Sequence, residues 1–122
     1  MTGVFGVEME TFDRRPSPRK RVLLPGLIVY GNDTFTCDCK FRNLSDTGAR
    51  VNLAHLTPLP RRFYLINVRD GVAHRARLVW NKGLEMGVNY ESALSLSAKP
   101  DIVFERLKKL WLAKLGRYSN DY

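Results

Sequence analysis

Hydrophobic and polar residues alternate most regularly between Thr34 and Phe41 (TFTCDCKF). Phe35, Cys37, Cys39 and Phe41 occupy every second position, and polar residues fill the positions between them. Successive side chains of a β-strand point to opposite faces, so a period of two is typical of a strand with one buried face. We therefore predict a half-buried strand here.

Further short segments rich in β-forming residues are also predicted to be strands, and residues typical of turns separate them. They cover 22–30, 49–53, 62–68, 73–80 and 85–90, with turn clusters at 31–33, 43–48, 69–71 and 81–83. Pro25 and Gly26 interrupt the first segment and predict a bulge or an edge position at that point. Short strands joined by tight turns favour an antiparallel barrel or sandwich over alternating β-α units.

The pattern changes to a helical period at Asp101. Phe104, Leu107, Trp111 and Leu115 share one stripe, flanked by Val103 and Leu110, whereas Glu105, Arg106 and Lys109 fall on the other side. Asp101 in the first turn and Gly116 after the last predict a helix over about 101–115. We expect its apolar stripe to pack on the strands, with partner binding or dimerisation as the alternative.

The length of 122 residues fits one domain. We expect a flexible N-terminal segment at 1–13, a barrel domain with its helix at 14–116, and a short tail at 117–122. No apolar run approaches the ~20 residues that span a bilayer, and the N-terminus lacks a secretory signal, which predicts a soluble cytoplasmic protein without membrane insertion.

The formal charge of +8 favours an anionic partner. Cys37 and Cys39 are the only cysteines, and His55 and His74 show no metal-ligand spacing, so we expect no metal site. The sequence also lacks a nucleophile elbow and a phosphate-binding glycine loop. These observations argue against an enzyme.

Two segments carry a binding hypothesis. In the first, Arg15-Pro16-Ser17-Pro18-Arg19, prolines stiffen a loop that holds two arginines, whose guanidinium groups can stack on a base or grip phosphate oxygens. Taken alone, it also fits a solvated basic loop or a nucleic-acid clamp.

The second segment is Asn43-Leu44-Ser45-Asp46-Thr47-Gly48. Asn43 and Ser45 are two positions apart, so on a continuing strand they present an amide and a hydroxyl to one ligand edge. Gly48 is expected to supply a left-handed backbone conformation. The alternative is a polar hairpin whose side chains cap their own backbone.

Together these segments resemble the two motifs of the PilZ domain family, R-x-x-x-R before the first strand and [D/N]-x-S-x-x-G after the next. The later segments LVW (78–80) and GVNY (87–90) are also similar. The resemblance covers about Arg14 to Tyr90. It implies a six-stranded antiparallel β-barrel with a C-terminal helix that binds the bacterial second messenger cyclic di-GMP and needs no other cofactor.

By position, the resemblance implies that Arg15 and Arg19 hold phosphate and guanine. Asn43 and Ser45 would bind a guanine edge, and Gly48 would shape the turn. Arg14 is a further contact, and Trp80 offers a stacking face or fills the barrel mouth. Asn43 replaces the more usual Asp, which lowers the expected affinity because an amide is a weaker acceptor than a carboxylate.

The implied function is a receptor or adaptor in which residues 1–21 close over the ligand and create a surface for a downstream protein in motility, biofilm or polysaccharide control. Two alternatives stay open: a PilZ-like adaptor that works through protein contacts alone, and a small basic barrel that binds nucleic acid. The complete motifs favour the receptor over both.

Overall fold

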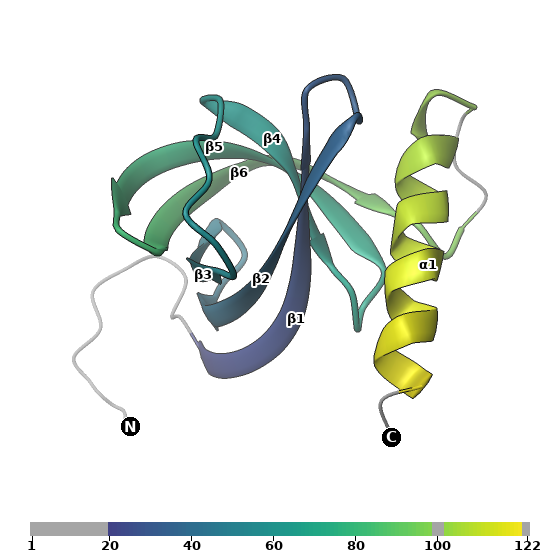
Figure 1. Ribbon diagram of the computed structural model, residues 1–122, viewed down its shortest axis with the longest axis horizontal. Helices are drawn as coiled ribbons and strands as arrows, with labels where there is room; N and C mark the ends of the chain where they lie inside the picture. Colours follow the sequence, from purple (N-terminus) through teal and green to yellow (C-terminus); the bar gives the residue numbers. More distant parts are fainter. Residues whose placement is uncertain (1–19, 99–101, 121–122) are drawn as a thin grey trace.

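The computed structural model describes residues 20–98 and 102–120, which form a barrel of six strands with one helix beside it (Figure 1). The elements, in chain order, are β1 (Lys20–Tyr30), β2 (Phe35–Leu44), β3 (Gly48–Leu53), β4 (Arg62–Asn67), β5 (Val72–Lys82), β6 (Glu85–Ser95), the 3-10 turn η1 (Ile102–Phe104) and α1 (Glu105–Asn120).

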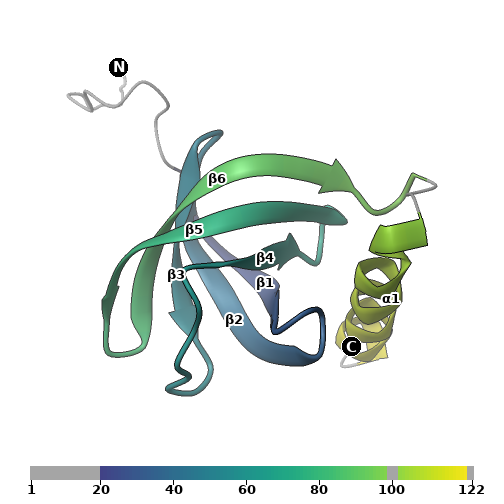
Figure 2. The same ribbon diagram turned by 90° about the horizontal axis from the view of Figure 1, so that it is seen from above.

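The strands close in the order β1-β2-β3-β6-β5-β4, and every neighbouring pair is antiparallel. β1 pairs with both β2 and β4, which closes the sheet on itself. Of the two architectures that the strand pattern left open, the barrel is therefore confirmed and the sandwich is wrong. Figure 2 shows α1 beside the barrel, at the end opposite the turn between β5 and β6.

The barrel interior holds one hydrophobic core. Cys37, Cys39 and Phe41 of β2 point into it, as the alternation predicted, but Phe35 is 56% exposed. Phe35 lies at the start of β2, next to the β1–β2 turn, and packs instead against Tyr30, with ring centroids 5.5 Å apart. The other buried members of this core are Ile28, Ala49, Val51, Leu53, Phe63, Leu65, Ala76, Met86 and Val88.

A second core lies outside the barrel, between α1 and the outer face of β1, β4 and β5. Leu107 and Trp111 of α1 are buried there, and the Trp111 indole N–H donates a hydrogen bond to the Val68 carbonyl oxygen at 2.7 Å. Leu27, Val29, Ile66, Val68, Ala73 and Leu96 complete the cluster. The predicted apolar stripe of the helix is thus confirmed as a packing surface.

The helix does not end where its sequence suggested. α1 continues through Gly116 to Asn120, so the prediction that Gly116 terminates the helix was wrong, and residues 117–120 belong to α1 rather than to a tail. A glycine ends a helix when it adopts a positive φ, and Gly116 is not among the glycines that do so. Its cost is only the backbone entropy of glycine inside a helix.

The predicted bulge at Pro25 and Gly26 is wrong, whereas the predicted edge position is confirmed for Pro25, which is paired on one side only. The register shift falls between Arg21 and Leu24, whereas Pro25 and Gly26 pair regularly with β2. Proline is tolerated because pairing with β4 begins only at Gly26, so Pro25 needs no N–H for that neighbour. Gly26 is required because a Cβ there would lie 2.9 Å from the Phe41 ring.

Candidate functional site

The turn between β2 and β3 carries the second predicted motif, and its hydrogen bonds fix the Ser45 side chain. The Ser45 N–H donates to the Gly48 carbonyl oxygen at 2.9 Å, and the Thr47 N–H donates to Ser45 Oγ at 3.3 Å. The Tyr90 N–H donates to the Thr47 carbonyl oxygen at 2.8 Å, which ties the turn to β6. These hydrogen bonds hold the turn in one arrangement against β6.

Gly48 is required for a different reason than predicted. Its φ is not positive, so the expected left-handed conformation is wrong. Instead, a Cβ at position 48 would collide with the Val88 carbonyl oxygen of β6 and approach Asn89 Oδ1 at 3.3 Å. Glycine lets β3 and β6 come together directly beside the turn.

A row of paired residues crosses the outer face of the barrel at this point. In β-sheet register, Arg21 pairs with Asn43, Asn43 with Arg50, Arg50 with Gly87, and Gly87 with Trp80. Arg50 and Gly87 alternate with residues of the interior core, so the row faces outward. Asn43 and Trp80 thus lie in one row, separated by three strand spacings, or about 14 Å.

Trp80 lies across Gly87 on this outer face. A Cβ at position 87 would collide with the indole, so the absence of a side chain creates the seat for the ring. Trp80 is 39% exposed and belongs to neither core. Of the two predicted roles, filling the barrel mouth is wrong, and an aromatic surface available for stacking fits the position.

Sequence reasoning missed Arg50 and Gly87. The Arg50 guanidinium pairs with the Glu85 carboxylate, with Nη2 to Oε2 at 2.8 Å, and its side chain remains 41% exposed. The alternation in ARVNL places Arg50 outward, but only the strand register shows that it lies between Asn43 and Trp80.

The first predicted motif precedes β1 directly. Arg14, Arg15 and Arg19 lie outside the described residues. Lys20, the next residue after Arg19, pairs with Leu44, and Arg21 pairs with Asn43. The start of β1 is therefore aligned with Asn43 and Leu44 of the second motif.

A hollow of about 350 Å³ adjoins the turn on its other side, lined in part by Ser45, Asp46, His74 and Tyr90. His74 stacks on Tyr90, with ring centroids 3.9 Å apart and planes inclined by 10°. Burial lowers the pKa of His74 and raises the pKa of Tyr90. Both side chains are neutral at neutral pH, so they add no charge to the site.

Within 20–98 and 102–120, no group of three or more His, Cys, Asp or Glu side chains could hold a metal ion. Burial raises the pKa of the Cys39 thiol, so it stays protonated and is a poor nucleophile. In the same part of the chain, no helix is long and apolar enough to cross a bilayer.

Comparison with known families identifies the domain. The family model of the PilZ domain matches residues 13–103. The chain belongs to the PilZ domain family. This confirms the resemblance inferred from the two motifs, both of which lie inside the matched residues of the PilZ domain.

PilZ domains are typically binding or adaptor domains, and the family binds cyclic di-GMP. A comparison with curated proteins finds no match for this PilZ domain.

Proposed function

We propose that this PilZ domain is a receptor for cyclic di-GMP. The observation that carries the proposal is the register between β1 and β2, in which Lys20 pairs with Leu44 and Arg21 with Asn43. Because Arg19 directly precedes Lys20 in the chain, this register supports a ligand site shared by the arginine motif at 15–19 and the polar turn at 43–48.

The residue chemistry suits a ligand with two phosphates and two guanines. Arg15 and Arg19 provide guanidinium groups for phosphate oxygens and base faces, with Arg14 as a further contact. Asn43 and Ser45 supply an amide and a hydroxyl for a guanine edge. The exposed indole of Trp80 adds a stacking face in the same outer row as Asn43.

Titration calorimetry with cyclic di-GMP tests the proposal. We expect saturable binding that linear GMP does not reproduce. Arg15→Ala should weaken binding by roughly ten- to a hundredfold, since a lost charge-assisted contact costs about 1.5–3 kcal/mol. Ser45→Ala removes a neutral hydrogen bond worth about 0.5–1.5 kcal/mol and should weaken binding by roughly two- to tenfold. Matched controls are Arg69→Ala and Ser97→Ala, which remove exposed side chains of the same types elsewhere. Flat heats from folded protein would overturn the proposal and favour a protein-binding adaptor.

We further propose that ligand binding orders residues 1–21 and thereby presents a new surface to a downstream protein in motility, biofilm or polysaccharide control. Amide exchange with and without cyclic di-GMP measures this directly. We expect added protection at 14–21, and unchanged exchange there at saturating ligand would contradict the closure.

Salt dependence distinguishes this receptor from a nucleic-acid-binding barrel. Binding to a polymer releases several counterions and weakens steeply with salt, whereas a ligand with two phosphates held partly by stacking responds less. A titration repeated at 50 and 200 mM salt should therefore change the affinity only modestly.

A further inference from the structure

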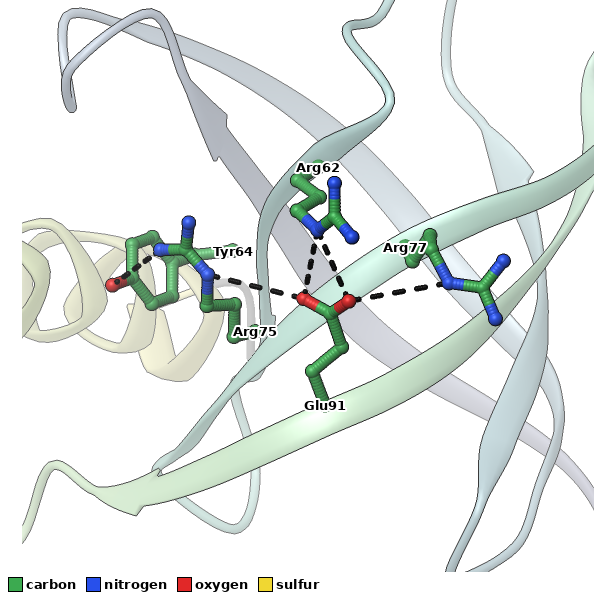
Figure 3. Close-up of polar contacts among 5 residues, drawn as sticks. All are labelled: Arg62, Tyr64, Arg75, Arg77 and Glu91. Atoms are coloured by element: carbon green, nitrogen blue, oxygen red, sulfur yellow. Dashed lines mark hydrogen bonds and ion pairs between the residues drawn. The ribbon is translucent and has the colours of Figure 1, made fainter.

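Three arginines surround a single carboxylate on the outer face of β4, β5 and β6 (Figure 3). Arg62 Nε lies 3.1 Å from Glu91 Oε1 and 3.0 Å from Oε2. Arg75 Nε lies 3.9 Å from Oε1, and Arg77 Nε lies 4.0 Å from Oε2. One negative charge therefore faces three positive charges, which leaves a positive excess at this point.

This arrangement is unfavourable for the barrel alone. Arg62 and Arg77 are direct partners in the β4–β5 register, and like charges opposite each other destabilise a sheet. Glu91 reaches them from a β-bulge, because Arg75 pairs with Ser92 and Ala76 pairs with Tyr90, so Glu91 is the extra residue between them. Bulges frequently re-aim a side chain beside a functional site.

The Glu91 carboxylate contacts the three arginines through their Nε atoms. No hydrogen bond joins it to their terminal Nη atoms, which can therefore donate hydrogen bonds to other groups. In Figure 3 both terminal nitrogens of Arg77 and the upper one of Arg62 point away from the carboxylate. Arg75 is held from its other side, since its Nη1 donates to Tyr64 Oη at 3.3 Å and its guanidinium lies 5.6 Å from the Tyr64 ring centroid. Side chains fixed in this way lose little conformational entropy when an anion binds.

A hollow of about 380 Å³ lies directly beside this cluster. Arg62 and Arg75 line it together with Tyr30, Tyr64 and Asp33. Tyr64 also packs edge-on against Phe104 of η1, with ring centroids 6.3 Å apart, so the wall of the hollow is supported from the helix side. The hollow offers room for side chains next to guanidinium groups.

We propose that this arginine cluster and its adjoining hollow form a docking surface for an acidic segment of a partner protein. Arg62 already holds both oxygens of a carboxylate, which shows that the cluster suits that group. The carboxylates of Glu91 and Asp33 lie within the surface and repel a continuous phosphate backbone, whereas separate acidic side chains can fit between them. Acidic peptide is therefore favoured over nucleic acid.

The docking surface adjoins the proposed nucleotide site but is distinct from it. Arg62 pairs with Arg77, Arg77 with Asn89, and Asn89 with Gly48, so Arg62 lies three strand spacings, or about 14 Å, from the β2–β3 turn. The proposal does not depend on nucleotide binding. Substitutions at Arg62 and Arg75 should leave the calorimetric titration with cyclic di-GMP unchanged.

Fluorescence anisotropy with three labelled probes tests the docking surface: a decapeptide of alternating Glu and Ala, its Gln analogue, and a ten-nucleotide thymidine oligonucleotide. We expect the Glu peptide to bind the full chain and the Gln analogue not to bind. The double variant Arg62→Gln/Arg75→Gln should weaken peptide binding at least about tenfold. Arg69→Gln/Arg117→Gln removes the same charge from exposed positions elsewhere and should change it less than about twofold.

Equal losses in the two double variants would overturn the proposal, because they would show a general effect of net charge. Absence of binding by the Glu peptide would also overturn the proposal. So would tighter binding of the oligonucleotide than of the peptide, if the Arg62→Gln/Arg75→Gln variant weakens oligonucleotide binding by the same factor. Circular dichroism checks that the variants fold. If the double variant does not, Arg62→Lys keeps the charge but removes the planar fork, and should still lower affinity about threefold.

Discussion

The outer surface of the barrel has two regions that differ in what covers them. Over β1 and β4, residues such as Leu27 and Ile66 face outward and are buried under α1. Over β2, β3 and β6, the outward row carries Asn43 and Arg50. Neither residue belongs to a hydrophobic core of the described residues, so this row is not buried under the helix.

The contrast is encoded in the hydrophobic pattern of each strand. β1 contains the nearly continuous apolar run LLPGLIVY, and over Leu27–Val29 both of its faces are buried, one in the barrel and one under the helix, whereas Leu23 at its start is 71% exposed. β2 alternates strictly and therefore has only one face to bury. A continuous apolar run predicts a strand that is buried on both faces. An alternating run of apolar and polar residues predicts a strand with one face exposed, which is then available for binding.

The two tryptophans sharpen this comparison, because one lies in each region. Trp111→Ala removes a buried ring and its hydrogen bond to Val68, and should lower the free energy of unfolding by about 3–5 kcal/mol. Trp80→Ala removes a ring that is 39% exposed and should cost less, about 1–2 kcal/mol, while weakening ligand binding. Urea unfolding followed by circular dichroism measures both, and equal losses would contradict the assignment of Trp80 to an open surface.

Gly48→Ala tests the close approach of β3 and β6 beside the turn. The added methyl group meets the Val88 carbonyl oxygen, so we expect a loss of about 1–3 kcal/mol in the free energy of unfolding. Gly83→Asn is the control, since position 83 has open space and a positive φ that asparagine tolerates. A neutral Gly48→Ala would mean that the turn does not need this approach.

Gly116→Ala tests how far α1, the helix that covers the buried region, extends towards the C-terminus. Because Gly116 lies inside α1 and a Cβ there meets nothing within 4 Å, alanine should stabilise the protein by about 0.5–1 kcal/mol. Thermal unfolding would detect the gain. No change in stability would indicate that the helix ends before this residue, as its sequence first suggested.

His74 gives the smallest effect and probes the inner side of the sheet through pH, because it pairs with the core residue Leu65 and stacks on Tyr90. Burial lowers its pKa in the folded protein, and a weaker attraction to Asp70 opposes this, so folding favours the neutral ring. Stability is therefore retained above the ordinary histidine pKa of about 6.5 and lost as pH falls through that value towards the folded pKa. His74→Phe keeps a ring to stack on Tyr90 and should flatten the fall in urea midpoint between pH 7.5 and 5.5, whereas His55→Phe, at an exposed position, should not.

The sequence alone was sufficient where local pattern decides the structure. The alternation in β2 placed Cys37 and Cys39 in the interior, and the helical period identified the stripe of Leu107 and Trp111. Phe35 was misplaced because its exposure depends on where the barrel ends relative to the β1–β2 turn, which local alternation does not encode.

The candidate site followed the same rule. Its polar motif could be identified from residue types, but the role of Gly48 comes from a contact with β6 that is remote in sequence. Arg50 and Gly87 joined the site only through strand register, in the β2–β3 pair and in the β3–β6 pair, whose strands are not consecutive in the chain. Pairing between distant strands is a property of the whole fold, and no short window of sequence contains it.

Closure of the barrel also has a kinetic consequence. The pairs that close it join residues distant in the chain, such as Gly26 with Asn67 and Gly48 with Asn89. Such contacts require loss of chain entropy before they contribute stability, and domains dominated by them refold on the order of milliseconds to seconds. The β5–β6 hairpin, joined by a short turn, can form early, whereas the β1–β4 and β3–β6 pairings carry the larger cost in chain entropy.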